Sequence, residues 1–150
     1  MRITLDSNIL VYAADHQAGE RHRAAADLLH RAARADCVLT LQSLGEFFHV
    51  ATRKMKRAAE DVALFVDAWR AAFAVHAASE QSLDSAVDLV KRHGLSFWDA
   101  MLWATAGDAG CRLLLSEDLH DGLALRGVTC VNPFAAQNTR LIVAALPPIG

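Results

Sequence analysis

Four acidic residues, far apart in the sequence, are candidates to hold a divalent metal ion: Asp6, Glu46, Asp99 and Asp118. Carboxylates that lie close together repel one another and raise each other's pKa, and a divalent cation relieves this repulsion. A ligand set of oxygens, with no Cys or His nearby, favours Mg²⁺ or Mn²⁺ over zinc. Such an ion can lower the pKa of a bound water and stabilise the attacking and leaving oxygens of a phosphodiester.

Each of these acids also has a purely structural interpretation. Asp6 could cap the helix that follows it, an interaction worth about 1 kcal/mol. The segment SFWD, which ends at Asp99, has the S-x-x-D form of a capping box. Asp118 stands in a loop, where Asp is common, and Glu46 could be a solvated helix residue. The metal site is favoured because all four acids fall on one predicted edge of the fold.

The elements that would position these acids alternate between short apolar strands and longer helices. Apolar runs and helical spacing predict strands over 3–5, 37–40, near 75, 111–116 and 128–131, and helices over 7–15, 20–34, 41–56, 60–73, 80–93 and 97–108. This alternation favours an α/β fold with a parallel sheet and right-handed crossovers. Ligands of open parallel sheets bind beyond the carboxyl ends of the strands, where the acids fall.

The bulk composition indicates one domain that spans residues 1–150. The chain has 53% hydrophobic and 21% charged residues, which disfavours disorder. The tail over 135–150 is ambiguous, since its RLIVAAL run could form a strand or a helix. A net charge of −2 excludes a globally basic nucleic-acid binder, but it leaves room for a local basic patch.

The cysteines and the apolar segments favour a cytoplasmic protein. Cys37, Cys111 and Cys130 form no C-x-x-C pair and are expected to be buried, reduced thiols. The first residues form no apolar stretch long enough for a signal peptide. No segment approaches the roughly 20 apolar residues that span a bilayer, so we expect no membrane insertion.

Five segments together resemble one family in their order and spacing. LDSNIL, the glutamate of LGEFF, SFWDA, LLLSEDL and VNPF resemble the PIN domain, in particular the VapC-type toxins of type II toxin–antitoxin pairs. The resemblance runs from the start of the chain to about Phe134, and the tail after it exceeds what the family predicts. It implies a PIN-like α/β/α sandwich, with a short parallel sheet flanked by helices, and Mg²⁺- or Mn²⁺-dependent endoribonuclease activity.

The resemblance assigns catalytic and metal-binding roles to the four acids. It implies that Asp6 and Asp99 bind the metal directly. Glu46 or Asp118 would position or deprotonate the attacking water, or hold a second metal ion.

The neighbours of these acids receive supporting roles. Ser7 is expected to support the loop and to cap the following helix, and Asn8 is expected to orient Asp6. Ser116 would supply an accompanying hydroxyl. Glu117 stands beside Asp118, and the two could exchange roles.

A basic run and several aromatic residues are candidate contacts for partners. TRKMKR offers four cations that could guide RNA phosphates: Arg53, Lys54, Lys56 and Arg57. The alternative is a solvated helix end with favourable charge. The resemblance also implies a cognate VapB-type antitoxin in the groove and a homodimer formed through helices. Trp69, Phe73 and Trp103 could lie in such contacts or in the core.

Two other functions compete with the nuclease. A phosphatase of the haloacid-dehalogenase kind needs D-x-D after the first strand, and here Asn8 replaces the second acid. A PIN-like module that only binds partners would be catalytically silent, and the intact set of acids argues against it. Walker and Rossmann loops are absent, which disfavours an enzyme that uses a nucleotide cofactor.

Overall fold

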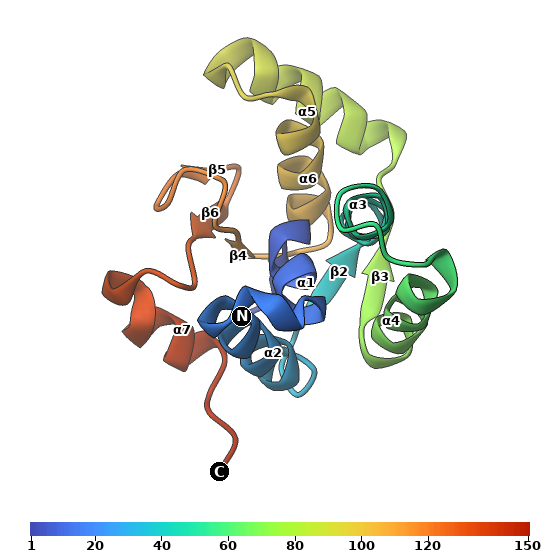
Figure 1. Ribbon diagram of the computed structural model, residues 1–150. Coiled ribbons are helices and arrows are strands. Elements are labelled where there is room, and N and C mark those ends of the chain that lie inside the picture. The colour runs from blue at the N-terminus through green and yellow to red at the C-terminus, as the bar shows by residue number, and fades with distance from the viewer.

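A short, mostly parallel sheet lies among helices in the computed structural model, which describes residues 1–150 (Figure 1). Strands β1 (Ile3–Leu5), β4 (Leu113–Leu115) and β6 (Val128–Val131) pair in parallel, and β5 (Ala124–Leu125) adds to β6 in the antiparallel direction. The spatial order is β1-β4-β6-β5. The α/β fold class predicted from the sequence is confirmed, although β5 falls in a segment for which no strand was predicted.

A second pair of strands continues beside β1. Strands β2 (Val38–Thr40) and β3 (Ala74–His76) pair in parallel. A single bridge joins Ile3 to Cys37, and the Ile3 amide donates to the carbonyl of Asp36 at 3.0 Å. Strand β1 therefore runs between β2 and β4, at the centre of the molecule.

Seven α-helices surround these strands. They are α1 (Ser7–Ala14), α2 (Glu20–Ala32), α3 (Leu41–Arg53), α4 (Ala59–Ala72), α5 (Glu80–His93), α6 (Phe97–Asp108) and α7 (Thr139–Ala145). Short 3₁₀ turns over His16–Ala18 and Ala136–Asn138 precede α2 and α7. Helix α3 ends earlier than predicted, and Lys56, which was predicted to be helical, has a left-handed backbone with φ of 54°.

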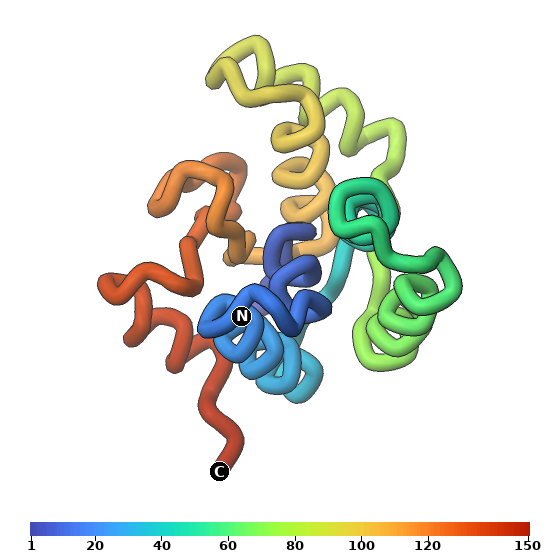
Figure 2. Tube along the Cα trace, viewed as in Figure 1, coloured from blue at the N-terminus to red at the C-terminus, as the bar shows by residue number.

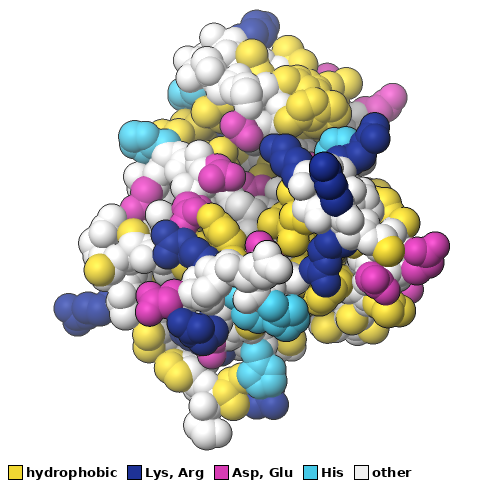
Figure 3. All heavy atoms as spheres, in the orientation of Figure 1, with side chains coloured by type: hydrophobic (Ala, Val, Ile, Leu, Met, Phe, Trp, Pro, Cys, Tyr) yellow, Lys and Arg dark blue, Asp and Glu magenta, His cyan; other side chains and the backbone are white.

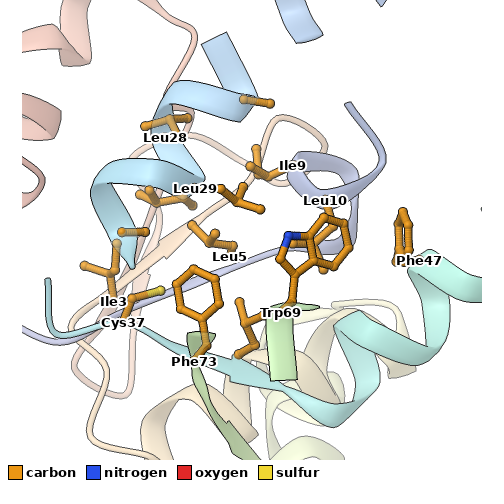
Figure 4. Close-up of a cluster of buried hydrophobic side chains, with 14 of the residues drawn as sticks. Ile3, Leu5, Ile9, Leu10, Leu28, Leu29, Cys37, Phe47, Trp69 and Phe73 are labelled. Atoms are coloured by element: carbon orange, nitrogen blue, oxygen red, sulfur yellow. The ribbon is translucent and has the colours of Figure 1, made fainter. Parts of the chain in front are cut away.

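Two apolar clusters fill the space on the two sides of the sheet. Along β4, Leu113 and Leu115 belong to the first cluster and Leu114 to the second, as the two-residue period of a strand requires. Figure 4 shows the first cluster, in which Trp69 and Phe73 lie near Leu5.

The packing decides the role of the large aromatic residues. Trp69 and Phe73 are buried in the first cluster, and Trp103 is only 1% exposed in the second. The Trp103 indole also donates to the carbonyl of Leu125 at 3.0 Å. Of the two alternatives for these residues, dimer contacts or the core, the structure places all three in the core.

The C-terminal tail contains a helix, α7, that packs against the first cluster. Ile142 and Leu146, in and after α7, are buried in the first cluster. The Arg31 Nε of α2 donates to the Leu146 carbonyl at 2.8 Å. Figure 2 shows the end of the chain passing beside α2. Of the two alternatives for RLIVAAL, the helix is correct.

Asp121 fastens this tail to the loop after β4. Its carboxylate accepts hydrogen bonds from the Asn132 amide at 2.8 Å and from the side chains of Asn138 and Gln137 at 3.0 and 3.2 Å. These hydrogen bonds, the Asn132 amide first, hold the pKa of Asp121 below its ordinary value. The loop and the segment after β6 are therefore joined by one charged acceptor.

Replacing Asp121 with alanine is expected to lower the free energy of unfolding by about 1–2 kcal/mol, because three donors each lose a hydrogen bond to its carboxylate. Since the folded state lowers this pKa, the stabilisation is present above the ordinary pKa and is lost as the pH falls through the folded value. Urea denaturation measures the loss. Asp84→Ala, at an exposed position of α5, is the control, and equal losses in the two variants would contradict this role.

Two further sequence predictions concern the thiols and the membrane. All three cysteines are free and buried, and burial raises the pKa of Cys37 to about 12, of Cys111 to about 11 and of Cys130 to about 12. They are therefore protonated, inert thiols, as expected. None of the helices combines the length and the apolar character that crossing a bilayer requires.

Candidate metal and catalytic site

Asp6 is the central residue of the site. It directly follows β1 and is 7% exposed. One carboxylate oxygen, Oδ1, accepts from the Ser7 amide at 2.7 Å, and the other, Oδ2, accepts from the Ser116 hydroxyl at 2.7 Å. The Asn8 side-chain amide reaches Oδ2 at 3.4 Å and the Ser116 hydroxyl at 3.1 Å. Residues that follow two neighbouring strands, Ser7 after β1 and Ser116 after β4, thus hold the buried Asp6 carboxylate in place.

The helix cap at this point is Asp6 itself, so the prediction that Ser7 caps α1 is wrong. Asp6 has an extended backbone and its side chain accepts from the Ser7 amide, while Ser7 is already the first residue of α1. The Ser7 hydroxyl instead donates to Glu46 Oε2 at 3.1 Å. The supporting role of Ser7 is therefore a link between α1 and α3.

The pKa of Asp6 is raised from 3.8 to about 6. Burial is the largest cause, and the hydrogen bonds from Ser116 and Ser7 offset part of it. The negative charges of Glu46 and Asp118 raise this pKa further. Two of the other three predicted acids thus act electrostatically on Asp6.

Glu46 is held from two sides on α3. Its Oε2 accepts from Ser7, and its Oε1 accepts from the Gln42 side-chain amide at 2.7 Å. The same Gln42 amide donates to the carbonyl of Trp98 at 2.9 Å. A Cβ atom added at Gly45, the residue before Glu46, would have no other atom within 4 Å. Gln42 therefore ties Glu46 to the first turn of α6.

Asp99 lies in that first turn and is partly buried. Ser96 precedes the helix but makes no side-chain capping bond, so the capping-box interpretation of SFWD is not borne out. However, no three Asp, Glu, His or Cys side chains stand close enough together to hold one metal ion. The structure brings Asp6 near Glu46 and Asp118, but it does not gather all four acids into one ligand set.

Glu117 and Asp118 follow Ser116 and point to different partners. The Asp118 amide donates to the Ser116 hydroxyl at 3.1 Å, and Asp118 is exposed. The carboxylate of Glu117 accepts from the Tyr12 hydroxyl at 2.6 Å and forms an ion pair with Arg21 at 2.7 Å. The Glu117 carboxylate is therefore engaged with α1 through the hydrogen bond at Oε1 and with α2 through the charge pair at Oε2, which accepts no hydrogen bond.

Phe134 packs against both partners of Glu117, Arg21 and Tyr12. The Arg21 guanidinium lies 4.5 Å from the centre of the Phe134 ring, and the Tyr12 ring packs edge-on against it at 5.8 Å. The hydrogen bond to Glu117 is also the main cause of a raised pKa at Tyr12. Sequence reasoning missed Tyr12, Arg21 and Gln42, since no local pattern marks a residue whose partner lies far away in the chain.

The basic run divides into exposed and structural cations. Arg53, Lys54 and Lys56 are exposed at the end of α3. Arg57 turns inward, where its guanidinium donates to the carbonyl of Ala14 and lies 5.4 Å from the centre of the Phe65 ring. Its prediction as an RNA contact is therefore not supported. Figure 3 shows Lys and Arg side chains standing over the end of α3, with acidic side chains on the same face.

The residues around Asp6 fit a hard divalent cation in their chemistry. The donors are carboxylates and hydroxyls, with no thiol or imidazole among them. Burial makes ionisation of the Asp6 carboxyl unfavourable, and the negative charges of Glu46 and Asp118 make it more so. A cation would relieve both the burial and the repulsion.

Comparison with known proteins identifies the family. A sequence profile of the PIN domain matches residues 3–120, and the chain belongs to this family. No curated protein matches it in sequence. A toxin–antitoxin complex from Klebsiella pneumoniae is similar in structure, with a TM-score of 0.65 and 20% identity over 88% of this chain and 98% of that one.

Two further solved structures share the fold. VapC20 of Mycobacterium tuberculosis, a toxin that cleaves the sarcin–ricin loop, has a TM-score of 0.62 and 21% identity, over 77% of this chain and 91% of its own. VapBC2 of Rickettsia felis, solved with a DNA fragment from its promoter, has a TM-score of 0.64 and 14% identity, over 87% and 97%. At these identities the likeness is one of fold.

Proposed function

We propose that this protein is a Mg²⁺- or Mn²⁺-dependent endoribonuclease, the VapC-type toxin of a type II toxin–antitoxin pair. The observation that carries the proposal is Asp6, a buried carboxylate at the end of β1 whose pKa is raised by burial and by Glu46 and Asp118. Its position in a PIN fold supports the proposal, as does the structural likeness to toxins.

Asp6 and Asp99 would hold the cation in this proposal. When bound, the cation would supply a more acidic water and would stabilise negative charge on the phosphate. Ser116 and Asn8 keep the Asp6 carboxylate in place by their hydrogen bonds. Glu46 or Asp118 orients the attacking water and accepts its proton, or holds a second cation.

The proposed partners are RNA, a cognate VapB-type antitoxin and a second copy of the chain. Arg53, Lys54 and Lys56 offer cations for the phosphates of RNA. The antitoxin is supported by relatives that were solved as toxin–antitoxin complexes. The proposed location is the cytoplasm.

Incubation of the purified protein with cellular RNA tests this function. We expect internal cleavage with Mg²⁺ or Mn²⁺ and none with EDTA. RNA that is bound but stays intact would favour a catalytically silent PIN module. Hydrolysis of a phosphomonoester without RNA cleavage would favour the phosphatase.

Matched amide substitutions can distinguish the roles of Glu117 and Asp118. Asp118→Asn is expected to lower the rate of RNA cleavage by about 10²-fold, because a group that orients or deprotonates water is lost. Glu117→Gln is expected to leave the rate within a few-fold and to lower the Tm by roughly 2–5 °C, because the ion pair to Arg21 is lost. Initial rates and thermal unfolding measure both effects. The reverse pattern of rates would assign the catalytic role to Glu117.

A further inference from the structure

Two histidines that the proposed function does not use lie together beyond the end of α1. His16 is exposed in the 3₁₀ turn, and His22 is partly buried in the first turn of α2. Their ring centres are 4.5 Å apart, and the planes are inclined by 56°. Residues six positions apart do not share a face of a helix, so it is the fold that brings the two imidazoles together. His side chains gather over this part of α2 on the face shown in Figure 3.

A hydrogen bond to the main chain fixes the His22 ring. Its Nδ1 lies 3.0 Å from the carbonyl oxygen of Tyr12 on α1. Because a carbonyl oxygen only accepts, Nδ1 carries a proton, and Nε2 of the neutral ring keeps a free lone pair. Histidines that bind metal ions commonly donate their other ring nitrogen to a carbonyl in this way, which orients the ring for the ion. His22 is thus prepared to act as a ligand through Nε2.

The separation of the two rings suits a shared cation. A zinc ion about 2.1 Å from a ring nitrogen lies about 3.2 Å from the centre of that ring. If the two bonds meet at an angle of roughly 90–110°, the ring centres are about 4.5–5.2 Å apart. The observed 4.5 Å falls at the lower end of this range. The inclined planes also differ from the nearly parallel planes of two stacked rings.

We propose that His16 and His22 form an exchangeable site for a divalent transition-metal cation such as Zn²⁺, distinct from the site around Asp6. Imidazole suits zinc, nickel and copper, whereas Mg²⁺ prefers oxygen ligands. No third Asp, Glu, His or Cys side chain completes a ligand set. Water therefore fills the other positions, and the ion is held less firmly than in a structural zinc site with four protein ligands.

The surroundings of the pair accommodate a hydrated cation. A cavity of about 370 Å³ adjoins His16 and gives room for water, and Asp15 in its wall adds a negative charge. Arg57 lines the same cavity, but its guanidinium donates to a main-chain carbonyl. The arginines on either side of His22 each pair with an acid: Arg21 with Glu117 at 2.7 Å and Arg23 with Glu20 at 4.0 Å.

Calorimetric titration of the full chain with Zn²⁺ at neutral pH, in an excess of Mg²⁺, tests this site without RNA. We expect one Zn²⁺ per chain. His22→Asn keeps a donor for the Tyr12 carbonyl but lacks Nε2, so it should fold like the wild type and bind Zn²⁺ at least tenfold more weakly. His16→Asn should show a similar loss. His30→Ala, at an exposed position of α2, is the control and should retain binding, as should Asp6→Asn.

Nuclear magnetic resonance of the ring nitrogens separates a ligand from a residue that merely supports the fold. Zn²⁺ should shift the ring nitrogen signals of His16 and His22 and leave those of His30 in place. Three results would overturn the proposal: a wild type that binds no Zn²⁺, wild-type affinity in either asparagine variant of the pair, and unshifted His16 and His22 signals at saturating Zn²⁺. Loss of Zn²⁺ binding in Asp6→Asn would also overturn it, because the ion would then occupy the other site.

Discussion

Replacement of Asp6 with asparagine is expected to abolish RNA cleavage, with a rate loss on the order of 10³-fold. The substitution keeps the shape of the side chain and an oxygen for the Ser7 amide. It removes the negative charge that Ser116 and Asn8 hold at the end of β1. Initial rates of cleavage of a labelled RNA, with saturating Mn²⁺, measure the effect.

The control for this substitution is Glu60→Gln. Glu60 is an exposed acid in the first turn of α4, so its loss removes the same charge away from the site. We expect it to cleave RNA at the wild-type rate. If Asp6→Asn retained more than roughly a tenth of the wild-type rate, Asp6 would not be the central acid of the reaction.

Without a bound metal, Asp6 is expected to make the protein less stable as the pH rises. Its pKa is raised from 3.8 to about 6 in the folded state, so the fold accommodates the protonated side chain better than the ionised one. The folded state binds more protons than the unfolded chain between these two values, and the free energy of unfolding therefore falls over that interval. A shift of this size corresponds to about 3 kcal/mol.

The comparison with Asp6→Asn isolates this effect from the titration of other acids. We expect the difference in unfolding free energy between the wild type and the variant, measured in EDTA, to change by about 2–3 kcal/mol over that interval. Added Mn²⁺ at neutral pH should stabilise the wild type and not the variant. A difference that stays constant with pH would mean that the Asp6 carboxylate is not perturbed by its surroundings.

Local patterns in the sequence predict the elements of this fold well. Helix α6 has the predicted bounds, because Ser96 starts an uninterrupted helical run. Helix α5 also ends where it was predicted to end, at a glycine whose left-handed φ of 68° stops the helix. The apolar run before Ser116 predicts β4, although only its last three residues, Leu113–Leu115, pair as a strand.

Contacts between distant residues could not be predicted in the same way. Ser7 does not cap α1 because Asp6 holds that position, and the hydroxyl of Ser7 has a partner on α3, 39 residues away. Arg57 belongs to a basic run, yet its guanidinium lies over the Phe65 ring and donates to the carbonyl of Ala14. The partners of Glu117 lie on two helices near the start of the chain. Such pairs depend on the packing of whole elements, which no short segment encodes.

The proposed function depends most on one expectation, that Asp6 and Asp99, from two distant parts of the chain, bind the same divalent cation. Calorimetric titration with Mn²⁺ at neutral pH, on the wild type and on single amide variants, tests it most directly. We predict that the wild type binds Mn²⁺, that Asp6→Asn and Asp99→Asn each lose this binding, and that Glu60→Gln retains it. Unchanged Mn²⁺ binding in Asp99→Asn would contradict the account, because the two carboxylates would then not share a cation.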